Sequence, residues 1–67
     1  MPSFANKAEF DDAVCTLATG AAVRVTIDGK SCWIPQSQID DDSEVYRAND
    51  HGKLVISEWI AIQKGLV

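Results

Sequence analysis

Few side chains in this sequence could carry out chemistry, and none belongs to a recognisable catalytic set. The one histidine, His51, falls in a predicted turn with no cysteine or serine nearby in the sequence to act as a nucleophile. Cys15 and Cys32 have the spacing of neither a metal site nor a disulfide framework, so we expect two free thiols. The four glycines stand apart, which leaves no glycine-rich phosphate loop. The sequence therefore predicts no enzyme, no cofactor and no metal site.

A cluster of carboxylates is the first candidate binding surface. Within five positions the chain carries four of them, Asp40, Asp41, Asp42 and Glu44. An EF-hand calcium loop would alternate its ligands and place a glycine at its sixth position, and this segment does neither. Such a cluster is typical of an exposed, solvated loop. The functional interpretation is that it engages a basic groove on a partner, with a second acidic site at Glu9, Asp11 and Asp12. Both interpretations stay open.

An aromatic residue supplies the second candidate surface. Trp33 is predicted to lie across from Arg24 on the polar side of a hairpin, where the two could form a cation–π pair. Tryptophan and arginine are enriched at binding hot spots, so an exposed pair would be an interaction site. We nevertheless favour burial of Trp33 beneath Trp59 and either Tyr46 or Val55, in a small second cluster.

The first element that must position these residues is a predicted helix over residues 6–20. Asn6 can cap the start of this helix with its side chain. The side chain of Glu9, three residues later, can accept a hydrogen bond from the Asn6 main-chain N–H in return. Gly20 can end it by adopting a positive φ. Between them, apolar residues recur at helical spacing, namely Phe10, Ala13, Val14 and Leu17. This helix would place Cys15 off its apolar face.

A β-hairpin is predicted around Asp28 and Gly29, because this dipeptide favours a two-residue turn of type I′. Apolar residues alternate on both sides of the turn, as expected of half-buried strands. The two-residue loop sets the pairing, which puts Arg24 opposite Trp33 and turns Cys32 inward. The second strand is expected to end at the proline that follows it.

The remaining elements are weaker predictions. Residues 44–47 and 53–56 are predicted as a third and a fourth strand, joined by a polar turn. Ser57 is predicted to cap a short helix over residues 59–64. The predicted fold class is α+β: an N-terminal helix packed on a small antiparallel sheet of about four strands, with a short C-terminal helix, in a single globular domain over residues 1–67.

Composition narrows the classes of partner. The chain has 67 residues and a net charge of -4, which speaks against holding nucleic acid or an anionic membrane by general charge. The longest apolar runs are far shorter than the roughly 20 residues that cross a bilayer. No basic segment followed by an apolar one marks a secretory signal. We therefore expect a cytoplasmic protein, a monomer or weak dimer, with no membrane contact and no direct nucleic-acid binding.

Three segments, DGKSCWIPQSQI at residues 28–39, SEWIA at 57–61 and KGL at 64–66, resemble a sequence pattern of short, mostly uncharacterised proteins of phages, prophages and other mobile elements. The resemblance spans roughly residues 23–66. Compact acidic proteins of such elements resemble, as a group, counter-defence inhibitors such as anti-CRISPR proteins. The resemblance implies a non-enzymatic protein that binds and inhibits a basic host nucleoprotein partner, with acidic side chains imitating DNA.

Three alternatives stay open beside this interpretation. One is a small nucleic-acid-binding domain that uses Trp33, Arg24, Arg47 and Lys53. The second is a structural accessory subunit of a phage. The third is a small regulatory enzyme, which no side-chain constellation in the sequence favours.

Overall fold

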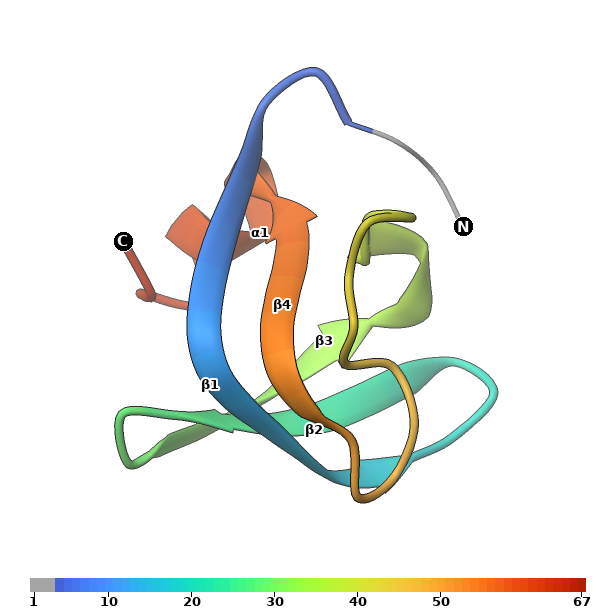
Figure 1. The fold of residues 1–67 in the computed structure, drawn as a ribbon. Coiled ribbons are helices and arrows are strands. Elements are labelled where there is room, and N and C mark those ends of the chain that lie inside the picture. Colours follow the sequence, from blue (N-terminus) through green and yellow to red (C-terminus); the bar gives the residue numbers. More distant parts are fainter. Residues whose placement is uncertain (1–3) are drawn as a thin grey trace.

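Four antiparallel strands and two short helical elements make up the computed structural model, which describes residues 4–67 (Figure 1). The strands are β1 (Lys7–Ala18), β2 (Ala22–Ile27), β3 (Lys30–Pro35) and β4 (His51–Ser57). They form one sheet in the order β3-β2-β1-β4. A 3₁₀ helix, η1 (Gln36–Gln38), follows β3, and the helix α1 (Glu58–Gln63) follows β4.

The N-terminal segment is strand β1, so the predicted helix over residues 6–20 is wrong. The predicted α+β class, with a helix packed on the sheet, is wrong as well, because the fold is mostly sheet with one short C-terminal helix. Phe10 lies opposite Leu54 and Ala13 opposite Gly52, which leaves two residues of β1 facing one residue of β4. Such a bulge adds one residue to the alternation of a strand. Inward-facing residues then stand three apart where the bulge occurs, and that spacing imitates a helix.

β1 is the strand that joins the two parts of the sheet. Its residues 7–14 pair with β4, and its residues 14–18 pair with β2. A second bulge lies between Cys15 and Leu17 against β2, and in the first bulge Asp12 has a φ of 58°. Bulges bend a strand and increase its twist. β1 therefore curves, and the β2–β3 hairpin crosses the direction of β4 (Figure 1).

The predicted β2–β3 hairpin is confirmed in its turn and in its register. Asp28 and Gly29 have φ values of 49° and 81°, as a type I′ turn requires. Arg24 lies opposite Trp33, and Val25 lies opposite Cys32. The second strand ends at its proline, where η1 begins.

The segment between η1 and β4 is held by side chains, and the predicted strand over residues 44–47 is wrong. The Asp50 carboxylate accepts hydrogen bonds from the main-chain N–H groups of Tyr46 (3.1 Å) and Arg47 (2.9 Å), which folds this stretch into a turn. The predicted fourth strand is confirmed as part of β4. The predicted cap is confirmed as well, because the Ser57 hydroxyl accepts from the Ile60 N–H at 3.2 Å.

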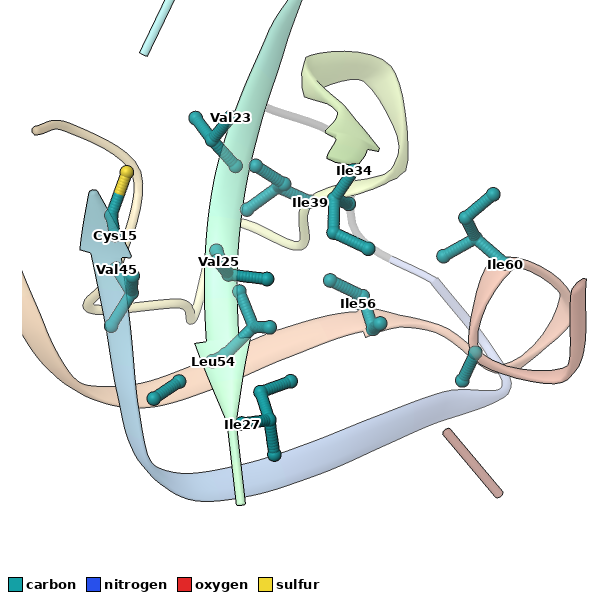
Figure 2. Close-up of a cluster of buried hydrophobic side chains, with 12 residues drawn as sticks. Cys15, Val23, Val25, Ile27, Ile34, Ile39, Val45, Leu54, Ile56 and Ile60 are labelled. Atoms are coloured by element: carbon teal, nitrogen blue, oxygen red, sulfur yellow. The ribbon is translucent and has the colours of Figure 1, made fainter. Parts of the chain in front are cut away.

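The core fills the space between the hairpin, β1, β4 and α1. Figure 2 shows this cluster, which consists of Ala13, Cys15, Val23, Val25, Ile27, Ile34, Ile39, Val45, Leu54, Ile56, Ile60 and Ala61. Cys15 is fully buried among them, so its predicted position off the apolar face is wrong. No helix in residues 4–67 has the length and apolar character needed to cross a membrane.

Candidate functional site

The acidic loop does not present all of its carboxylates to solvent, because Asp40 is fully buried. Its carboxylate accepts hydrogen bonds from the main-chain N–H groups of Asp42 (2.9 Å) and Phe4 (2.8 Å). It also lies 3.5 Å from the Lys7 ammonium. These two hydrogen bonds, helped by Lys7, hold the pKa of Asp40 below its usual value. Asp40 therefore ties the N-terminal segment to the loop.

The other three carboxylates of this loop are exposed, and two of them have partners. Asp42 forms an ion pair with Lys7 at 3.1 Å, and this contact does most to raise the pKa of the lysine. Glu44 accepts a hydrogen bond from the main-chain N–H of Lys53 at 3.0 Å. Asp41 has neither an ion pair nor a side-chain hydrogen bond within residues 4–67.

The second predicted acidic site lies on strand β1. There Glu9 is 3.7 Å from the Lys53 ammonium, and Asp12 is 3.8 Å from the His51 imidazole. Asp11 is exposed between them. Exposed pairs of this kind add little stability. The Lys53 ammonium offsets the charge that Glu9 would present to a partner. That these carboxylates bind a partner stays a prediction.

Trp33 is exposed on the side of the sheet that faces away from the core. The pairing of β1, β2 and β3 sets Leu17, Arg24 and Trp33 side by side in one cross-strand row. The Trp33 side chain is 42% exposed and that of Leu17 is 51% exposed. Trp59 is exposed as well, so the predicted burial of Trp33 beneath it is wrong.

A second row on the same side of the sheet is smaller and more polar. It consists of Val14, Thr26 and Ser31, with the two hydroxyl oxygens 2.9 Å apart. We call the two rows together the Trp33 face, comprising Val14, Leu17, Arg24, Thr26, Ser31 and Trp33. Neither β2 nor β3 contains a carboxylate, so the face combines apolar area, hydroxyl groups and one cation.

The Arg24 guanidinium has no ion pair within the described part of the chain. The cation–π contact found there joins Arg47 to the Tyr46 ring, at 5.3 Å, and does not involve Trp33. The predicted nucleic-acid set is not brought together either. Lys53 lies on β4, at the opposite edge of the sheet from Trp33 on β3.

Sequence reasoning missed an apolar groove beside α1. It has a volume of about 590 Å³ and is lined by Phe4, Ala5, Asn6, Gln38, Ser57, Glu58, Trp59 and Ile62. The helix buries Ile60 and Ala61, which leaves Trp59 60% exposed and Ile62 55% exposed. The signal in the sequence was the run Trp-Ile-Ala-Ile, since a short helix cannot bury apolar residues on all sides.

The two cysteines are free thiols, as predicted, and neither is activated. Burial raises the pKa of the Cys15 thiol, and the nearby Asp50 carboxylate raises it further. Burial also raises the pKa of Cys32, although the charge of Lys64 opposes this. The thiolate is the nucleophilic form, so both environments disfavour reaction. Within residues 4–67 no three His, Cys, Asp or Glu side chains are grouped so as to hold a metal ion.

Comparison of the chain with models of known protein families, with curated proteins and with solved structures finds no match in any of the three.

Proposed function

We propose that this protein is a non-enzymatic binding module that engages a protein partner through the Trp33 face. The observation that carries the proposal is the exposure of Trp33 beside Arg24, on a sheet whose other side already holds a complete core. Tryptophan and arginine are the residue types most enriched where binding energy concentrates. A large exposed ring flanked by Leu17 has no role in the packing of the core, so a partner surface accounts for it best.

The acidic surface supports the imitation of DNA less well than it supports solubility. Asp40 is buried, and three of the remaining predicted carboxylates, those of Glu9, Asp42 and Glu44, contact a lysine ammonium or a main-chain N–H group. Inhibition of a basic host nucleoprotein thus stays a weaker proposal. We place the protein in the host cytoplasm, and its two unbonded cysteines support a reducing compartment.

Affinity capture with matched tryptophan variants tests the proposal. The tagged wild-type chain, Trp33→Ser and Trp59→Ser would each be used to recover proteins from the host lysate, with quantitative mass spectrometry as the readout. Trp59 is the control because it is also exposed but lies outside the Trp33 face. We expect a partner to be recovered by wild type and by Trp59→Ser, and at least about tenfold less by Trp33→Ser.

Equal recovery of all partners by wild type and Trp33→Ser would overturn the proposal, provided that both chains have the same thermal midpoint. A double variant, Asp11→Asn with Asp41→Asn, distinguishes binding through the acidic surface from binding through the Trp33 face. If this variant loses a partner that Trp33→Ser keeps, the acidic surface is the binding site.

A further inference from the structure

Strand β3 forms an open edge of the sheet, because among residues 4–67 it pairs with β2 alone. Ile27 and Lys30 flank the two-residue turn and exchange main-chain hydrogen bonds, and bonded pairs then alternate along the hairpin. By this alternation, the main-chain N–H and C=O groups of Ser31 and Trp33 point away from β2. Outside the ladder, no hydrogen bond within residues 4–67 uses them.

The opposite edge of the sheet, along β4, is covered by the preceding loop. The Asp40 N–H donates to the Val55 carbonyl at 2.8 Å, and the Glu44 N–H donates to the Lys53 carbonyl at 2.8 Å. The Val55 N–H donates to the Ser43 hydroxyl at 3.2 Å. Natural proteins block or cover exposed edges unless they use them. Only one of the two edges in the described chain is protected in this way.

The open edge also gathers cations that have no carboxylate partner. Arg24 and Lys30 belong to the hairpin, and Lys64 lies close enough to Cys32 for its charge to act on the thiol. None of the three forms an ion pair within residues 4–67. The one carboxylate of the hairpin is Asp28, in the turn. By contrast, the two lysines near β4 are paired with carboxylates. Positive charge is therefore uncompensated on the side of the molecule where main-chain groups are free.

We propose that an extended acidic segment of the partner adds to the sheet as a fifth strand along β3. The segment pairs its main chain with Ser31 and Trp33. Its side chains alternate, so carboxylates lie near Lys30 and Lys64 on the side to which Cys32 turns, and apolar side chains pack against the Trp33 ring on the other side. This inference rests on the proposed function and specifies the chemistry of the partner. Charge argues against a second copy at the same edge, because two such edges would bring like charges together. A nucleic-acid strand offers no row of alternating N–H and C=O groups to pair with the edge.

Two synthetic peptides of about eight residues test the inference, one alternating Glu and Val and the other alternating Lys and Val. Fluorescence anisotropy measures their binding to the full chain, and amide hydrogen exchange followed by NMR locates it. We expect the Glu peptide to bind at least about tenfold more tightly than the Lys peptide, with a preference that falls as salt is added. The Ser31 and Trp33 amides should exchange at least about tenfold more slowly in the complex.

Two lysine variants provide a matched pair for this measurement. Lys30→Gln should weaken binding of the Glu peptide several-fold, whereas Lys53→Gln should not, because Lys53 lies on β4 at the opposite edge of the sheet. Equal affinity for the two peptides overturns the inference. So does binding of the Glu peptide without slower exchange at the two edge amides.

The other occupants of the edge give distinct results. Slow exchange of the edge amides that depends on protein concentration, together with a dimer in sedimentation, assigns the edge to a second copy. Slowing by an oligothymidylate but not by the Glu peptide assigns it to nucleic acid. If capture of a partner still depends on Trp33 while the peptide fails, the inference alone falls. If capture does not depend on Trp33, the proposed function falls.

Discussion

Asp40 connects three parts of the chain through one carboxylate, which contacts Phe4, Lys7 and Asp42. Replacing it with Asn keeps the size of the side chain but removes the charge and one acceptor oxygen, so one of the two partly buried main-chain N–H groups, that of Phe4 or of Asp42, loses its acceptor. We expect Asp40→Asn to lower the thermal midpoint clearly. Asp41→Asn is the control, because Asp41 is exposed and makes no side-chain hydrogen bond within residues 4–67. Equal midpoints for the two variants would show that the Asp40 contacts do not stabilise the fold.

The same residue makes stability depend on pH in a defined direction. The pKa of Asp40 is lowered in the folded protein, so the folded state holds its proton less tightly than the unfolded chain does. Its stabilising effect is present above the unfolded pKa, near 4, and is lost as the pH falls through the lower folded pKa. The difference in stability between wild type and Asp40→Asn should therefore be largest near neutral pH and should shrink in acid. Urea titrations across this range measure it.

The sequence could place Trp33 and Arg24 but not Asp40. The tryptophan and the arginine belong to one hairpin, whose two-residue turn sets their pairing locally. Asp40 is buried by partners near the start of the chain, and no local pattern reports such a distant contact. An acidic run therefore looked uniform in sequence, although one of its members belongs to the interior.

At the level of the elements, the bulge in β1 determines which residues face the core. Asp12 holds a φ of 58° there, a conformation that Asp tolerates and that a β-branched residue does not. We expect Asp12→Val to cost about 1–2 kcal/mol in the free energy of unfolding, and Asp12→Gly to be neutral or slightly stabilising. Loss of the exposed contact with His51 adds little to either value.

Asp11→Val is the matched control for the bulge. Asp11 is also exposed on β1, but its φ is not positive, and valine suits a strand. Its free energy of unfolding should stay within about 0.5 kcal/mol of wild type. Equal losses for the two valine variants would mean that the backbone at Asp12 is not strained.

The same bulge explains why one element was predictable and another was not. Strict alternation in β2 and β3 ends at a two-residue turn, so the hairpin could be derived down to its register. In β1, two bulges break the alternation. The three-residue spacing from Phe10 to Ala13 in the sequence is also the spacing of a helical turn. Pairing with β4 and β2 makes this segment a strand, and that pairing exists only in the folded chain.

For the molecule as a whole, the small core sets a narrow margin of stability. Domains gain roughly 0.05–0.15 kcal/mol per residue, so this chain has about 3–10 kcal/mol in total. Ile56 is fully buried at the centre of the core, and Ile56→Ala should cost about 2–5 kcal/mol. We therefore expect Ile56→Ala to be largely unfolded at physiological temperature, as measured by circular dichroism.

Ile62→Ala is the control for the core variant. Ile62 is 55% exposed on α1. The free energy of unfolding of Ile62→Ala should therefore differ from that of wild type by no more than about 0.5 kcal/mol. A folded Ile56→Ala with an unchanged midpoint would place that side chain outside the core.

The pairing of β1 with β4 has a consequence for how fast the chain folds. The hairpin closes over two residues and forms within microseconds, whereas Lys7 and Ser57 must find each other across most of the chain. Closing so long a loop costs entropy, and the chain loses this entropy before the contacts between the two strands can offset it. We expect the folding rate to be set by this meeting of the distant ends, after the hairpin that carries Trp33 has taken shape.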